Sequence, residues 1–285
     1  GDGNFGMRQK EGEGRVDPAR IKLAVAIDEL HEIDGPFIHQ RGITLVAGAG
    51  GGEGARHVER HHPCPRRVGQ IDAAIGRAAV DIDGAGDTGR DHDLRISHVG
   101  IDRKHTTAED PGTWFPLPDL RRAAERGRIG SLAPRFHGLP TNRSHRVTLE
   151  IDCPEVVARC RDDGVDAAIL IANCPVCHQS IALAARALEA AGIATVVMGC
   201  AKDIVEHVGV PRLLFSDFPL GNAAGRPKDR ESQTFTLELA LKVLETAPAA
   251  RTTVQSPLVW STSPDWKLDF QNIAQLSPEE IARRR

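Results

Sequence analysis

Two cysteines and a histidine form the part of the sequence whose residue types and spacing best suit chemistry. Cys174 and Cys177 are separated by two residues in the run NCPVCH, which spans residues 173–178. A thiolate is the reactive form of cysteine, and a second thiol at this spacing can resolve a mixed intermediate as an internal disulfide. His178 follows directly and can supply a proton or a positive charge. The pattern therefore favours redox chemistry by a dithiol.

Two other interpretations of the cysteine pair stay open on the sequence alone. The pair could be a buried structural feature of a strand–helix junction. It could also be half of a zinc or iron–sulfur site, which commonly uses four ligands. Cys153 and Cys160 could supply the other half, because residues seven apart share one face of a helix. Neither of them, however, has the spacing typical of zinc ligands.

The elements around the pair predict where it lies. Residues 166–172 form a nearly uninterrupted apolar run, typical of a strand buried on both faces. Residues 177–191 are rich in Ala and Leu and predict a helix that Gly192 ends. Ligands of open parallel sheets bind beyond the carboxyl ends of the strands. The free N–H groups and positive dipole end of a helix N-terminus also favour a thiolate there.

Strands and helices alternate through the rest of the later chain. We expect helices at residues 117–126, 154–163, 203–208 and 234–245, strands at 193–198 and 212–216, and a short helix opening at 277–280. This alternation is typical of βαβ units. We therefore predict an α/β fold, a three-layer sandwich with a mainly parallel, Rossmann/flavodoxin-like sheet.

The chain changes character near residue 90. Residues 1–90 hold more than half of the 28 glycines and show little hydrophobic periodicity, so we expect a poorly patterned N-terminal region that is disordered or atypical. Within it, residues 21–30 suit either a helix or a buried strand, and residues 43–47 suit a short strand. Residues 91–285 are expected to form the α/β domain.

Composition excludes several classes of function. The net charge of −3 gives no electrostatic attraction to nucleic acid. Six cysteines in 285 residues are too few for a disulfide scaffold. No apolar run is long enough to cross a bilayer, and the first residues lack the pattern of a signal peptide. We expect a cytoplasmic protein that binds neither nucleic acid nor membrane.

Three further patterns have simpler explanations. The glycine-rich run at residues 48–54 matches neither the dinucleotide fingerprint nor a P-loop, so a flexible turn is favoured. A cluster of three histidines and Cys64 at residues 57–64 is interrupted by prolines and suits a solvated basic loop. Aspartates at positions 81, 83, 87, 91 and 93 fail the EF-hand spacing and are interpreted as turn residues.

The segment around the cysteine pair resembles the selenoprotein B family of glycine, sarcosine, betaine and D-proline reductases. The resemblance rests on residues 166–191, with their strand, their cysteine motif and their Ala-rich helix. Further stretches agree from about residue 91 to the end of the chain. They are Arg95–His98, Phe115–Leu117, Ile129–Pro134, Phe218–Asn222, and Trp260 with Pro264 and Trp266.

This resemblance implies an oxidoreductase that cleaves a substrate bond reductively, with a dithiol–disulfide couple as electron partner. Cys174 occupies the position that is often selenocysteine in the family and is the implied nucleophile, and Cys177 is the implied resolving thiol. His98 lies in a family-like stretch and is a candidate acid, base or substrate contact, although a structural role is equally compatible.

The resemblance also implies partners. They are a small amine or amino-acid-like substrate, a thioredoxin-like electron donor and other subunits of a reductase complex. No bound cofactor is expected. The alternatives to this enzyme are a zinc or iron–sulfur binding module that uses Cys174 and Cys177, or a non-catalytic subunit that keeps the fold.

Overall fold

The computed structural model describes residues 22–28, 31–32, 85–92, 94–95, 100–102, 104–106, 110–141 and 143–269. All of these residues belong to one compact unit, which comprises Gly1–Glu32 and Val80–Arg285, while Ile33–Ala79 form a second unit. Several sequence predictions lie outside the described residues: His98, and the features at residues 43–47, 48–54, 57–64 and 277–280.

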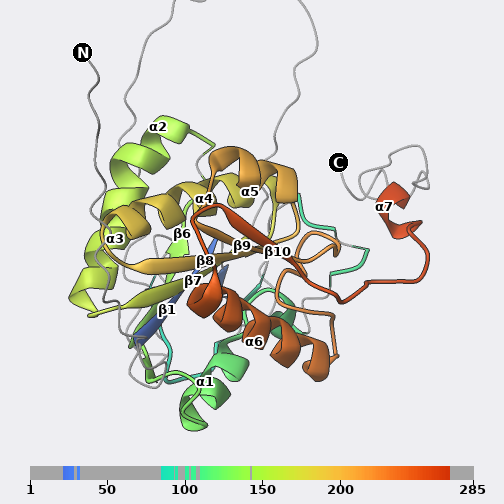
Figure 1. Cartoon of the computed structure of the whole chain (residues 1–285), viewed down its shortest axis with the longest axis horizontal. Coiled ribbons are helices and arrows are strands. Elements are labelled where there is room, and N and C mark those ends of the chain that lie inside the picture. Colours follow the sequence, from blue (N-terminus) through green and yellow to red (C-terminus); the bar gives the residue numbers. More distant parts are fainter. Residues whose placement is uncertain are drawn as a thin grey trace, which may run out of the picture. The chain divides into compact units, whose positions relative to one another are not determined.

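The centre of the unit is a mainly parallel sheet of eight strands in the order β10-β9-β8-β7-β1-β6-β3, with β5 also paired to β1 (Figure 1). Among the described strands of this sheet, only β3 is antiparallel to its neighbour, β6. The strands are β1 (Lys22–Asp28), β3 (Ala85–Asp87), β5 (Ser131–Leu132), β6 (Arg135–Leu139), β7 (Ala167–Ile171), β8 (Ala194–Gly199), β9 (Arg212–Phe215) and β10 (Thr252–Gln255). A separate antiparallel pair joins β2 (His31–Glu32) to β4 (Leu94–Arg95).

Helices cover both faces of the sheet, so the predicted three-layer α/β fold is confirmed. Figure 1 shows α1 and α6 on one face and α3, α4 and α5 on the other. The helices are α1 (Leu117–Glu125), α2 (His145–Val147), α3 (Cys153–Asp162), α4 (Pro175–Ala190), α5 (Lys202–Val208), α6 (Arg230–Thr246) and α7 (Trp266–Asp269), with a 3-10 turn at Pro111–Thr113 and a π-helical turn at Thr148–Asp152.

Strand β7 shows why the apolar run of the sequence forms a central strand. All five of its residues are buried. Ile169 and Ile171 pack in the layer under α1 and α6, whereas Ala168 and Leu170 pack in the layer under α3, α4 and α5. Because side chains alternate across a strand, burial of both faces requires apolar residues at every position.

The first strand of the sheet comes from the part of the sequence that shows little periodicity. Residues 21–30 suited a helix or a strand, and the structure has strand β1 there. It pairs in parallel with both β6 and β7, so it lies inside the sheet and not at its edge. The domain boundary expected near residue 90 stays a prediction.

Most predicted elements agree with the structure, but several begin or end elsewhere. Helix α4 begins at Pro175, two residues before the predicted start, because proline is well suited to the first helical position. Helix α6 begins four residues early, capped by the Asp229 carboxylate, which accepts from the Ser232 N–H. Strands β6 and β10 were not predicted, because RFHGL and TTVQ carry polar residues that hide the apolar signal.

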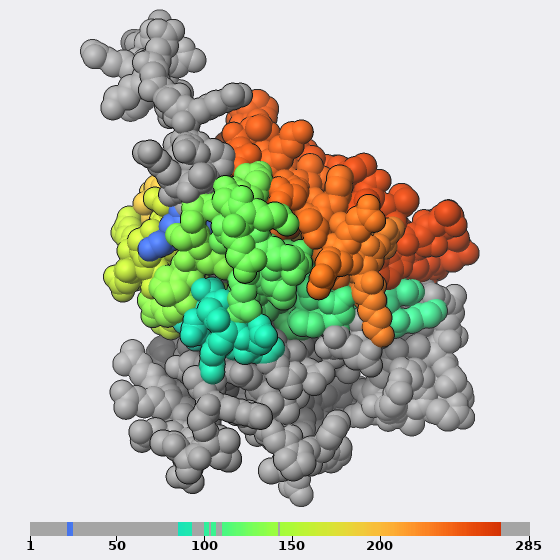
Figure 2. All heavy atoms as spheres, turned by 90° about the horizontal axis from the view of Figure 1, so that it is seen from below, coloured from blue at the N-terminus to red at the C-terminus, as the bar shows by residue number. Residues whose placement is uncertain are grey.

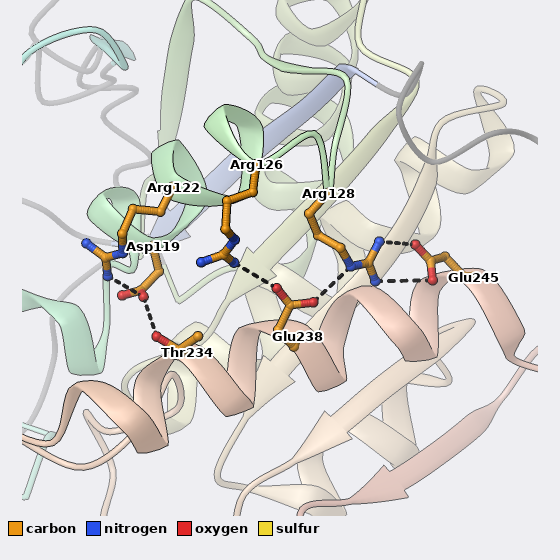
Figure 3. Close-up of polar contacts among 7 residues, drawn as sticks. All are labelled: Asp119, Arg122, Arg126, Arg128, Thr234, Glu238 and Glu245. Carbon is orange, nitrogen blue, oxygen red and sulfur yellow. Dashed lines mark hydrogen bonds and ion pairs between the residues drawn. The ribbon is translucent and has the colours of Figure 1, made fainter.

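Helices α1 and α6 lie side by side, so that green and orange surfaces meet in Figure 2. A row of polar contacts joins them (Figure 3). The Glu238 carboxylate accepts from Arg126 at 3.0 Å and from Arg128 at 2.8 Å. Arg128 also pairs with Glu245, which raises the pKa of its guanidinium. Glu238 therefore links two arginines that follow α1 to the middle of α6.

We predict that Glu238→Gln lowers the free energy of unfolding by about 1 kcal/mol, because it removes the charge shared by two guanidinium groups on a partly exposed surface. Urea unfolding of the full chain measures the change. Glu125→Gln is the matched control, since Glu125 is an exposed carboxylate of α1 outside this network. An equal loss of stability in both variants would show that the effect comes from removing a negative charge and not from breaking the contacts of Glu238 with the two arginines.

Candidate active site

The turn between β7 and α4 holds the cysteine pair in a helix-capping arrangement. Cys174 has extended backbone angles and is the N-cap residue of α4. Its sulfur accepts a hydrogen bond from the Cys177 N–H at 3.1 Å. A helix N-cap usually offers a Ser, Thr, Asp or Asn oxygen for this purpose, so sulfur takes the place of that oxygen here. The Cys177 N–H therefore points at the sulfur of Cys174, the residue that the family resemblance implies as the nucleophile.

The two cysteines are joined by a disulfide, with their Cα atoms 4.9 Å apart. The structure therefore brings the predicted pair together in its oxidised form. Both side chains are buried, and the hydroxyl of Thr141, two residues after β6, lies 3.9 Å from the Cys177 sulfur. The pair consequently sits among residues that follow two different strands.

The position of this turn in the sheet is also the one where α/β proteins bind ligands. From β1 the chain moves to β6 on one side, then returns to β7 on the other side and continues outward through β8 and β9. The direction of progress therefore reverses between β1 and β7. Binding sites of open parallel sheets lie at such a reversal, beyond the carboxyl ends of the strands. Cys174 follows the carboxyl end of β7.

His178 connects this turn to the end of β8. Its Nε2 accepts hydrogen bonds from the N–H groups of Cys200 and Ala201, at 2.8 and 3.0 Å. Because Nε2 accepts, Nδ1 carries the proton and donates to the Cys174 carbonyl oxygen at 2.6 Å. Burial lowers the pKa of His178 to about 4, so the ring is neutral at neutral pH. Gly199 makes room for it, since a Cβ there would lie 2.9 Å from the ring.

The other cysteines of the described chain are poor nucleophiles. Burial raises the pKa of Cys153 and Cys160 to about 11. Burial also raises the pKa of Cys200 to about 12, although the N–H groups of Asn222 and Phe218 act in the opposite direction. At neutral pH these three thiols are almost entirely protonated. Among the described residues, no group of three or more His, Cys, Asp or Glu side chains lies together as a metal site.

A short segment covers the disulfide. Ile101 packs against Cys174 and Cys177 with its side chain nearly buried. The Asp102 N–H and the Thr106 hydroxyl both donate to the Leu220 carbonyl oxygen, each at 2.9 Å. These contacts hold Ile101 over the sulfur atoms. We therefore expect Ile101 to limit the access of a thiol reductant to the disulfide.

The sequence interpretation missed Asn173, the residue directly before the pair. Asn173 is 2% exposed, and neither its Nδ2 nor its Oδ1 has a hydrogen-bond partner among the residues that the structure describes. The signal in the sequence was a polar residue placed directly after an apolar strand and directly before a cysteine. Its lack of partners is a property of the fold and could not be predicted.

The remaining candidates of the sequence are placed as follows. Cys174, Cys177 and His178 form one cluster, whereas His98 lies outside the described residues. The Asp87 carboxylate accepts from the Gly89 N–H in a turn, and exposed Asp91 pairs with Arg121. These two aspartates thus act as turn and surface residues.

Comparison with known proteins identifies a relative of this chain. The chain is 31% identical over 167 residues to the D-proline reductase subunit gamma of Acetoanaerobium sticklandii (strain ATCC 12662 / DSM 519 / JCM 1433 / CCUG 9281 / NCIMB 10654 / HF). The match covers 58% of this chain and 69% of that protein. No protein-family model and no solved structure matches the chain. Within the described part of the chain, the helices are too short or too polar to span a bilayer.

We predict that acid weakens the fold through His178. The folded chain requires the neutral ring, while the unfolded chain binds a proton below its usual pKa of 6.5. Stability is therefore full above pH 6.5 and falls as the pH drops toward 4, by roughly 3 kcal/mol for this residue. Urea unfolding at several pH values measures the slope. His137, whose pKa burial also lowers to about 4, adds to it in the same direction.

His178→Gln should flatten this pH dependence, whereas His207→Gln should not, because His207 is exposed on α5. The same slope in wild type and His178→Gln would contradict the assignment.

We predict that Ile101→Ala speeds reduction of the disulfide by dithiothreitol roughly tenfold. The loss of about 1.4 kcal/mol of apolar packing favours local opening by this factor. The rate is followed by mass spectrometry after alkylation of the released thiols. Leu149→Ala is the control, since Leu149 is a half-exposed aliphatic residue of the π-helical turn. Equal reduction rates in Ile101→Ala and wild type would mean that Ile101 does not limit access.

Proposed function

Because the chain belongs to the family of the D-proline reductase gamma subunit, we propose that it is a dithiol-dependent reductase component acting on a small amine or amino-acid-like substrate. The observation that carries the proposal is the Cys174 sulfur, which caps α4 beyond the carboxyl end of β7 and is bonded to Cys177. The relative belongs to a multi-subunit reductase, so a complex with other subunits is part of the proposal.

The reaction consumes the dithiol and breaks one substrate bond, X–Y. The Cys174 thiolate attacks X, and Y departs with the bonding electrons and takes up a proton to give Y–H. The Cys177 thiolate then attacks the Cys174 sulfur, and the S–X bond breaks with its electrons on X, which takes up the second proton. The products are X–H, Y–H and the disulfide. Two electrons and two protons pass from the thiols to the substrate.

The helix cap supports Cys174 as the attacking residue. The Cys177 N–H and the N-terminal end of the sixteen-residue helix α4 both favour negative charge on the sulfur. Sulfur replaces the selenium that the selenoprotein B resemblance implies at this position, so this stabilisation compensates in part for a weaker nucleophile. A thioredoxin-like protein would then reduce the disulfide and restore the dithiol.

We assign His178 a positioning role and not that of the proton donor. Both of its ring nitrogens are engaged with backbone groups, and the ring is neutral at neutral pH. By holding the Cys174 carbonyl against the end of β8, it fixes the turn that presents the sulfur. His98 stays a candidate acid or base. We further propose that the reaction needs no bound cofactor and takes place in the cytoplasm, where dithiol donors are available.

The test of this proposal is turnover with defined substrates. The full chain, purified with any subunits that remain bound, is supplied with a dithiol reductant and with D-proline, sarcosine, glycine or betaine. Cys174→Ser should abolish turnover, because no attacking thiol remains. Cys177→Ser should stop after one event and leave a substrate adduct on Cys174 that intact mass detects. Cys160→Ser is the matched control and should retain turnover, because Cys160 packs in the layer under α3, α4 and α5 and has no contact in the Cys174–His178 network.

Turnover that survives Cys174→Ser would contradict the mechanism. Zinc or iron bound stoichiometrically by the reduced chain would favour the metal-binding alternative. A complex whose activity tolerates loss of both Cys174 and Cys177 would favour a non-catalytic subunit.

A further inference from the structure

A small cavity lies between strand β6 and helix α3, and none of the residues that line it takes part in the dithiol chemistry. Its wall includes His137 and Leu139 of β6, together with Asp152, Glu155 and Arg159 along α3 and the turn before it. The centre of a water-sized group has about 20 Å³ of free space there, and one bound water needs roughly 10–15 Å³ by the same measure. The cavity can therefore hold a single water-sized molecule or ion.

His137 gives this cavity a buried polar group without a full set of partners. It is 1% exposed. Leu139 packs in the layer under α3, α4 and α5, and because side chains alternate along a strand, the His137 ring lies in the same layer. Its Nε2 lies 3.2 Å from the Asp163 carboxylate, whereas its Nδ1 has no hydrogen-bond partner among the residues that the structure describes. Burying an unpaired polar atom costs roughly 1–3 kcal/mol, so packing alone does not explain a histidine here.

The unpaired nitrogen of His137 is an acceptor. Burial lowers the pKa of His137 to about 4, so the ring is neutral at neutral pH and has one N–H and one bare nitrogen. The Asp163 carboxylate beside Nε2 favours the proton on that atom, which leaves Nδ1 bare. The charge of Arg159 also lowers this pKa, as expected for a ring that faces α3. A ligand of the cavity must therefore offer a donor to His137.

The charged groups of the wall favour a cation. Asp152 and Glu155 carry carboxylates, and Arg159 carries a guanidinium that pairs with Glu155. Two carboxylates and one guanidinium leave one net negative charge, because the histidine of the wall is neutral. Asp152 is largely buried and ends the π-helical turn Thr148–Asp152, a rare conformation that is frequent at functional sites.

We propose that this cavity binds one ammonium ion, which donates N–H groups to the Asp152 carboxylate and to the His137 Nδ1. An alkali ion carries the same charge but has no N–H, so it would leave Nδ1 unpaired. Among the described residues, no three His, Cys, Asp or Glu side chains lie together as a metal site, which argues against a divalent metal here. Amino acids are too large for the space, and their carboxylates would meet the acidic wall. The inference does not depend on the proposed function.

The experiment observes the bound ion directly. The full chain is titrated with isotopically labelled ammonium chloride at constant ionic strength, and nitrogen-edited proton NMR separates an ammonium ion held in a buried site from the free ion. Wild type should bind one ion per chain in a saturable manner. Unlabelled ammonium should displace the bound ion, whereas sodium chloride, potassium chloride and glycine at the same concentration should not.

Variants assign the binding to the cavity. Asp152→Asn should weaken binding roughly tenfold to a hundredfold, because it removes a hydrogen bond to a charged group, and His137→Leu roughly twofold to tenfold. Asp152 makes no side-chain cap to α3, so asparagine, which has its size, should preserve the fold. Glu150→Gln is the matched control, since it removes an exposed carboxylate from the same π-helical turn, where Glu150 pairs with Arg146 outside the wall. This variant should bind ammonium as wild type does.

Each outcome has a defined meaning. Loss of binding in Asp152→Asn and His137→Leu, at an unchanged urea midpoint, would support the inference. It is overturned if wild type holds no saturable ammonium, if sodium, potassium or glycine displaces the ion as readily as ammonium, if both variants bind as wild type does, or if Glu150→Gln weakens binding as much as Asp152→Asn. The displacement series needs no variant, so the inference can fail even where a substitution disturbs the fold.

Discussion

The hydrogen bond from the Cys177 N–H to the Cys174 sulfur is the contact on which the rest of the site depends. It sets the sulfur at the first free donors of α4, and the helix in turn is held over the sheet by its apolar face. His178, one residue later, reaches back to the Cys174 carbonyl and across to the end of β8. The turn after β7, the start of α4 and the end of β8 are therefore fixed around one sulfur atom.

Chemical identity alone does not distinguish the cysteines of this chain. Cys153, Cys160 and Cys174 are all buried, but burial raises the pKa of the first two, which lie against apolar side chains of the layer under α3 and α4. Cys174 differs because a backbone donor and a helix terminus point at its sulfur. The reactivity that we propose for Cys174 therefore rests on local backbone geometry, and Ile101 packs against the pair.

The sequence predicts those elements of the fold in which burial requires an unbroken run of apolar residues. The apolar run at residues 166–172 predicts β7 because both faces of that strand are covered. Strand β6 carries Arg135, His137 and Gly138, so its place in the sheet follows from its pairing with β1 and β3 and not from its own composition. For the site, spacing predicted the pair of thiols and the turn that carries them. The hydrogen bonds of the His178 ring, and the lack of described partners around the Asn173 amide, depend on how distant segments pack together. The spacing of residues in the sequence does not reveal them.

The position of β1 has a consequence for how the chain acquires its structure. Leu23 lies opposite Ala167, and Ala26 lies opposite His137, so a segment near the beginning separates two strands that occur more than a hundred residues later. Closing such long loops is entropically costly and slows folding. Until β1 inserts, β6 and β7 each present an open edge that can pair with another chain. A fragment cut at residue 90 would keep both edges open, so the weakly patterned beginning of the chain also protects the dithiol sheet from aggregation.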